Sequence, residues 1–180
     1  LHQEEYINRA FAAIDANSSL EEQYADDAKK AVATYLQNIP VDEGQIAKMC
    51  TRLELLKFKE GVIGDEELSG YYSTKDNKNY TITLDTITEG KIKDDAARDA
   101  VVFHEMCHVF SNTQTSKWFQ EGMTSTLEND IALGGEMSHT VYDIYYRIIS
   151  VLTELLGTDI MLEAYLTGNE SIIYHQLNKY

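Results

Sequence analysis

Hydrophobic residues recur at helical spacing through the first part of the chain, and this pattern predicts helices there. Residues 3–15 are weakly periodic. Ser19 and Glu22 have the spacing of a capping box, which predicts that the next helix begins there. This second helix should run to about Asn38, because Pro40 cannot continue it.

A second capping pair, Asp42 with Gln45, predicts the start of a third helix. We expect that helix to run to about Glu60 and to end at Gly61. Residues 1–60 are therefore expected to form a helical N-terminal part.

The pattern changes to that of strands between residues 61 and 88. Tyr71–Tyr72 and Tyr80–Leu84 are rich in aromatic and β-branched residues, and the second run alternates apolar and polar positions. The polar segment 74–79 between them predicts a turn. We expect a β-hairpin, extended into a small sheet by Val62–Ile63.

Helical patterns return at about Asp94 and continue to the end of the chain. One helix is expected to Phe110, and after a polar loop a second over 117–131, ended by Gly134–Gly135. The C-terminal part, 138–180, predicts a long helix that begins at Ser138 or Thr140 and ends at Gly157. It also predicts helices over 159–167, ended by Gly168, and over 170–178, capped by Asn169. The predicted fold class is α+β and mainly helical, in a single domain over 1–180.

Composition narrows the classes of function. The chain has 180 residues and a formal net charge of −15. Such an acidic surface repels nucleic acid and anionic lipid, so neither is an expected partner. No apolar run approaches the ~20 residues that span a membrane. The two cysteines, Cys50 and Cys107, make no disulfide framework, and we favour two buried thiols over one bridge.

The most informative motif is His104-Glu105-Met106-Cys107-His108, an HExxH pattern. Residues four apart lie on one face of a helix, so both imidazoles can face one Zn²⁺. Glu105 can then reach a metal-activated water as general base. With five histidines in the chain, random placement would give roughly 0.01 such matches.

The helix around the motif is apolar on nearly all sides, which predicts that it is buried. Buried histidines and a glutamate would be costly without a partner. A pair of ordinary core histidines is the alternative interpretation.

A catalytic zinc needs a third protein ligand. The class whose third ligand is a histidine six residues after the second is excluded, because Gln114 stands there. Glu121 is the best candidate, since the short loop 111–116 lets the two helices pack antiparallel with Glu121 level with His108. His139 and His175 are more distant alternatives.

HExxH followed by Trp118-Phe119-Gln120-Glu121-Gly122 resembles the gluzincin metallopeptidases, in particular the peptidase-MA-like families with a W-x-x-E-G signature. The likeness covers roughly residues 95–170. It implies a zincin-like domain in which His104, His108 and Glu121 hold one Zn²⁺ that activates water for the hydrolysis of peptide or protein substrates.

The resemblance also implies roles for further residues. Glu105 would take a proton from water and pass it to the leaving amine. A tyrosine or histidine would help to stabilise the oxyanion. Tyr142 and Tyr146 are the candidates, with Tyr145 adjacent and His139 as runner-up. A zincin usually presents an edge strand to its peptide substrate, and Tyr80–Leu84 is the candidate for that strand.

Other functions compete with peptide hydrolysis. A zincin-like binding or regulatory module that retains its metal but is catalytically silent is the main alternative, although such a module has no need of Glu105. A deformylase is disfavoured because neither cysteine has the required context. A structural zinc site is disfavoured because it normally has four protein ligands.

The chain begins with Leu1, not Met, so we expect a processed product exported to the surface or exterior of a bacterium.

Overall fold

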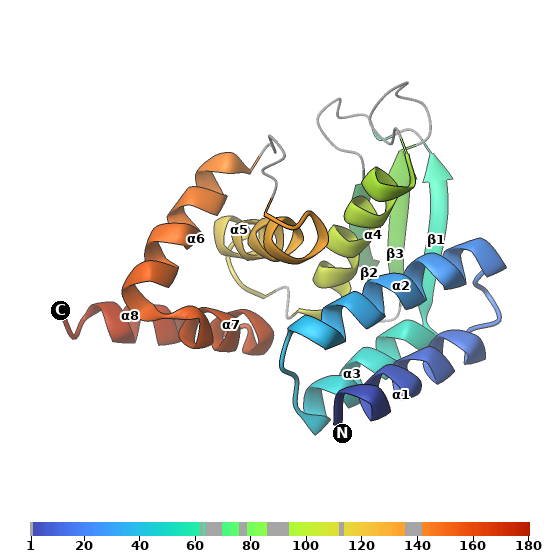
Figure 1. Ribbon diagram of the computed structural model, residues 1–180, viewed down its shortest axis with the longest axis horizontal. Coiled ribbons are helices and arrows are strands. Elements are labelled where there is room, and N and C mark those ends of the chain that lie inside the picture. The colour runs from blue at the N-terminus through green and yellow to red at the C-terminus, as the bar shows by residue number, and fades with distance from the viewer. Residues whose placement is uncertain are drawn as a thin grey trace. The chain divides into compact units, whose positions relative to one another are not determined.

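The structure is a computed structural model that describes residues 2–61, 63, 70–75, 79–85, 94–111, 114–135 and 142–180. The chain divides into two compact units, Leu1–Val109 and Phe110–Tyr180. Figure 1 shows helices as the main element, together with one three-stranded sheet. The predicted α+β, mainly helical class is confirmed.

The first unit begins with three helices, α1 (His2–Ala16), α2 (Glu22–Asn38) and α3 (Glu43–Glu54). The capping box of α3 forms as predicted: the Gln45 backbone N–H donates to Asp42 Oδ1, and the Asp42 backbone N–H donates to Gln45 Oε1, each at 2.8 Å. The cap predicted for α2 is wrong. Its N-cap is Glu21, because the Ser19 hydroxyl and backbone N–H both donate to Asn17 Oδ1.

The sheet contains β1 (Leu56–Gly61), β2 (Gly70–Lys75) and β3 (Asn79–Asp85), in the order β1-β3-β2. The predicted hairpin is confirmed, since β2 and β3 pair antiparallel with Tyr72 opposite Ile82. The expected extension of α3 to Glu60 is wrong, because residues 56–61 form a strand parallel to β3. Of the predicted partner segment, Val62 lies outside the described residues.

The strand order also corrects the expected substrate edge. Tyr80–Leu84 lies in β3, which has a neighbour on each side and is therefore the central strand. Among the described residues, the edges of the sheet are β1 and β2.

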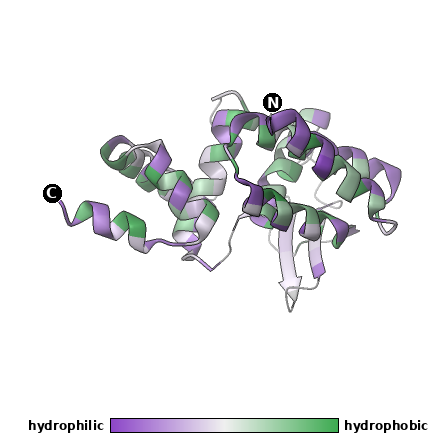
Figure 2. Ribbon diagram, turned by 90° about the horizontal axis from the view of Figure 1, so that it is seen from below, coloured by the Kyte–Doolittle hydropathy of each residue, from purple (hydrophilic) through white to green (hydrophobic). Residues whose placement is uncertain are grey.

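The core of the first unit lies where α1, α2 and α3 pack together and where α4 (Asp95–Phe110) covers the sheet. Figure 2 shows that α1, at the end marked N, carries hydrophilic and hydrophobic residues on different sides. Its inward side holds Ala10 and Ile14. Fully or almost fully buried side chains fill the rest of this core: Val32, Tyr35, Leu36, Ile46, Leu53, Leu56, Ile82, Leu84, Phe103 and Met106.

One buried amide fastens the helices to the sheet. Asn17 follows α1, and its Nδ2 donates to the carbonyl oxygens of Leu53 and Leu56, each at 2.8 Å. These carbonyls lie at the end of α3 and the start of β1. Asn17 therefore holds the change from helix to strand that directs β1 toward β3.

The second unit contains α5 (Lys117–Leu127), a short π-helix η1 (Glu128–Ala132), α6 (Asp143–Leu156), α7 (Thr158–Thr167) and α8 (Ser171–Leu177). Gly168 ends α7 in the left-handed region with φ 70°, as its position predicted. The structure begins α6 at Asp143, and the predicted starts at Ser138 and Thr140 lie outside the described residues.

Two further findings concern the described part of the chain as a whole. Neither Cys50 nor Cys107 forms a disulfide, and Cys107 is buried while Cys50 is half-buried. No helix there is long and apolar enough to cross a membrane.

Asn17→Ala should lower the free energy of unfolding by about 2–3 kcal/mol, because it removes two buried hydrogen bonds to carbonyl groups. Asn38→Ala is the matched control, since the Asn38 side chain donates a single, exposed bond to the Thr34 carbonyl. Its effect should stay below about 1 kcal/mol. Urea denaturation followed by circular dichroism measures both, and equal effects would contradict the role of Asn17.

Candidate metal centre

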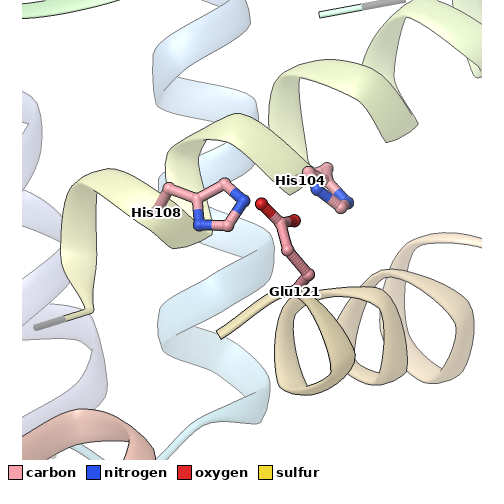
Figure 3. A group of neighbouring side chains, drawn as sticks. All are labelled: His104, His108 and Glu121. Atoms are coloured by element: carbon pink, nitrogen blue, oxygen red, sulfur yellow. The ribbon is translucent and has the colours of Figure 1, made fainter. Parts of the chain in front are cut away.

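Three of the residues singled out in the sequence bring their metal-binding atoms together. His104 and His108 lie on α4 and Glu121 lies on α5. One ligand atom from each of them lies within 4.8 Å of the other two. Figure 3 shows both imidazoles projecting from one helix and the Glu121 carboxylate directed toward them. This group could hold a metal ion, and it is the one such group among the described residues.

The donor set fits a transition metal such as zinc. Two imidazole nitrogens with one carboxylate oxygen form the type of site that leaves a coordination position open. Bonds of about 2.0–2.1 Å place tetrahedral donors roughly 3.3 Å apart. The observed spread of up to 4.8 Å is wider, so the side chains would have to rotate inward to bind an ion with these bond lengths. His108 is buried, while His104 and Glu121 are half-buried.

Helix α4 is fastened at both ends. Near its start, Arg98 donates from Nε and Nη2 to Asp27 Oδ2 of α2, at 3.1 and 2.8 Å. Asp94 Oδ1 accepts from the Ala97 backbone N–H and caps the first turn. At the other end Arg52 of α3 donates to the Val109 carbonyl at 2.6 Å, where a cation also complements the helix dipole. These contacts hold the two histidines in place along the helix axis.

Strand β2 lies against the same stretch of α4. A Cβ added to Gly70 would lie 2.7 Å from Val101 Cγ1 and 3.2 Å from Glu105 Oε1. The β2 backbone therefore approaches the Glu105 carboxylate closely, and a side chain at position 70 would push Val101 or Glu105 aside. Glu105 itself is only 6% exposed.

Two residues further along β2, Tyr72 stacks on His108 with ring centres 6.2 Å apart and planes 10° from parallel. This contact restricts rotation of the imidazole. Burial raises the pKa of Tyr72 to about 12, so the phenol stays neutral at physiological pH.

Helix α5 carries Glu121 and has its own supports in the second unit. A Cβ on Gly122 would lie 2.7 Å from Ile149 Cγ1 and 3.0 Å from the Tyr145 carbonyl oxygen, so α5 and α6 cross in close contact there. The Thr124 and Tyr165 hydroxyls share a buried hydrogen bond of 2.8 Å, which ties α5 to α7.

The loop before α5 is held by one buried amide. Gln120 Nε2 donates to Ser111 Oγ, and Gln120 Oε1 accepts from Thr115 Oγ1 at 2.8 Å. The Ser116 backbone N–H donates to Glu170 Oε2, also at 2.8 Å, and this carboxylate lies at the positive end of α5. The direction in which α5 begins is thereby fixed, and Glu121 with it.

The other predicted site residues are placed as follows. Tyr142 precedes α6 and stacks on Tyr145, with ring centres 5.8 Å apart. The Tyr146 hydroxyl accepts from Asn129 Nδ2 at 3.2 Å. The role of Tyr142 or Tyr146 as oxyanion donor stays a prediction. His175 is exposed on α8 and is outside the metal group, and His139 lies outside the described residues.

Sequence reasoning missed Gly70, Tyr72 and Gln120. Gly70 and Tyr72 come from a strand distant in sequence from α4, so no local spacing pointed to them. Gln120 stood inside the W-x-x-E-G signature, but nothing in the pattern marked it as the residue that holds the loop.

No protein-family model, curated protein or solved structure matches this chain.

Gly122→Ala should destabilise the protein, because its methyl group would overlap the α6 backbone, which cannot move aside easily. We expect the free energy of unfolding to fall by about 1–3 kcal/mol, although alanine favours helix by up to ~1 kcal/mol. Gly61→Ala is the control, since a Cβ there meets nothing within 4 Å, and it should change stability by less than about 0.5 kcal/mol. Urea denaturation compares the two, and a neutral Gly122→Ala would refute the close crossing.

Proposed function

We propose that this protein is a zinc-dependent peptidase of the gluzincin type, with a zincin-like catalytic domain. The observation that carries the proposal is the convergence of His104, His108 and Glu121 within 4.8 Å, with a glutamate directly after the first histidine. The spacing selects this chemistry because it supplies two ligands and a base from a single helix turn.

When bound at these three residues, Zn²⁺ supplies Lewis acidity that lowers the pKa of water and polarises a carbonyl group. Glu105 accepts the proton of the attacking water on its carboxylate and later donates it to the leaving amine. Tyr72 holds His108 in the orientation that ligation needs, through the observed ring stack. The second-unit tyrosines Tyr142 and Tyr146 remain the proposed donors to the oxyanion.

Strand β2 is the proposed substrate edge, in place of Tyr80–Leu84. Among the described residues, β2 pairs with β3 on one side only. Its first residue, Gly70, lies near the Glu105 side chain, since a Cβ added there would be 3.1 Å from Glu105 Cγ. An extended peptide that pairs with the open edge of β2 would bring its backbone close to that carboxylate. Backbone hydrogen bonds do not depend on the identity of the side chains, so this pairing would accept peptides of varied sequence.

The metal assignment is tested by zinc content and affinity. Wild-type protein should bind one zinc per chain, and Glu121→Gln should weaken binding at least tenfold because it replaces a charged ligand. Glu163→Gln, on an exposed position of α7, removes the same charge elsewhere and should leave affinity unchanged. Competition with a chromogenic chelator gives the dissociation constants. Equal affinity in the wild-type and Glu121→Gln proteins would remove Glu121 from the ligand set.

Catalysis is tested separately with Glu105→Gln. This variant should keep its zinc and lose about 10²–10⁴-fold in peptide cleavage, since only the base is removed. A peptide-library digest read by mass spectrometry, with and without chelator, measures the activity. A wild-type protein that binds zinc but cleaves nothing in the library would favour the catalytically silent module.

The stacking tyrosine has its own test. Tyr72→Leu should weaken zinc binding by about tenfold, because His108 loses the ring that restricts it. Tyr72→Phe keeps the ring and should bind within about threefold of wild type. If both variants bind zinc as tightly as the wild type, the stack has no part in positioning His108.

A further inference from the structure

Helix α6 carries a second apolar side that its own unit leaves uncovered. Ile144, Ile148, Val151 and Leu155 are 71, 41, 56 and 55% exposed. Their spacing is four, three and four residues, which is the repeat of the a and d positions in a coiled-coil seam. Scattered exposed apolar residues are ordinary, but a continuous stripe along a helix marks an interaction surface.

The stripe is separate from the side of α6 that builds the unit. Ile149 is fully buried and lies at the crossing with α5, beside Gly122. Leu152 and Leu156 are half-buried. The helix is thus apolar on two sides, and only one of them belongs to the core of the second unit.

The charges beside the stripe indicate what covers it. Arg147 and Glu154 are exposed, seven residues apart, and occupy the same flanking position in successive heptads. In a parallel pair of α6 helices, Arg147 would face an apolar leucine, Leu152, of the other copy. In an antiparallel pair, Arg147 of each copy faces Glu154 of the other, and two ion pairs form.

We propose that the outward side of α6 binds α6 of a second copy of this chain, antiparallel and about a two-fold axis. Ile144 then packs on the partner's Leu155, and Ile148 packs on the partner's Val151. Because the same stripe serves both copies, the contact is isologous and closes at two chains. This inference does not depend on the metal or on the proposed activity.

The contact is small, so the association should be weak. A 14-residue helix is about 21 Å long, and a pair of such helices buries less than the roughly 800 Å² per partner of a standard stable interface. The net charge of −15 on each chain adds repulsion, which salt near 0.15 M largely screens. We therefore expect a dissociation constant between about 1 μM and 1 mM, reached without any additional protein.

Sedimentation equilibrium of the full chain, from about 1 μM to 1 mM at 0.15 M salt, tests the proposal. Wild-type protein should pass from monomer to dimer and form nothing larger. Ile148→Asp and Val151→Asp should each shift the midpoint at least tenfold toward higher concentration. Tyr174→Asp, at a 53% exposed position of α8 outside the stripe, is the matched control and should leave the midpoint unchanged.

A charge exchange tests the antiparallel register. Arg147→Glu or Glu154→Arg alone places like charges opposite each other and should weaken the dimer several-fold. The double variant restores opposite charges and should return to the wild-type midpoint. Circular dichroism verifies that each variant is folded. A wild-type protein that stays monomeric at 1 mM overturns the proposal, and so does a dimer that Ile148→Asp and Val151→Asp leave intact. If the double variant is as weak as the single variants, the antiparallel register is wrong.

Discussion

Helix α4 is buried and yet carries ionisable side chains, and the arrangement of the first unit around it follows from that constraint. Glu105 and His108 are less than a tenth exposed, on a helix that also packs Phe103 and Met106 into the core. Ionisable groups are tolerated in such a place only with defined polar or aromatic neighbours. Strand β2 provides them, through a backbone brought close at Gly70 and a ring stacked by Tyr72. Contacts with α2, α3 and β2 also keep α4 from sliding along its axis, so the two histidines stay at fixed positions.

Local signals predicted much of this fold. The Asp42–Gln45 cap, the alternation in Tyr80–Leu84 and the stop at Gly168 each act within a few residues, and the structure contains all three. Strand β1 was missed because Lys57, Lys59 and Glu60 are good helix formers, and its strand conformation comes from pairing with β3. Without β1, β3 would have only β2 as a neighbour, so β3 was expected to be an edge strand. Ser19 does not cap α2 because its hydroxyl donates a hydrogen bond to Asn17 Oδ1 instead. The Asn17 amide is itself held by a hydrogen bond to the distant Leu53 carbonyl.

The candidate site also contains features that local sequence predicts and features that depend on long-range contacts. The spacing of His104 and His108 and the short loop before Glu121 were enough to predict that these three side chains lie together, because helical spacing alone brings a histidine pair to one face. The residues that orient them act across the fold. No feature of Gly70 or Tyr72 in the sequence distinguishes them from nine other glycines and eleven other tyrosines. Their importance appears only when β2 is placed against α4.

The hydrogen bonds that Gln120 makes with Ser111 and Thr115 affect how the three metal-binding side chains come together during folding. All three donors come from a span of eighteen residues, His104 to Glu121. The hydrogen bonds of Gln120 to Ser111 and Thr115 reduce the number of residues in that span that can move independently. The conformational entropy lost in bringing the donors together is therefore the entropy of closing one short loop. This cost rises with loop length, so it is lower for a short loop than for a long one. Loops of about this size close in roughly 10–100 ns. Assembly of the ligand set is therefore a local event, and the slower pairing of β1 with β3 need not precede it.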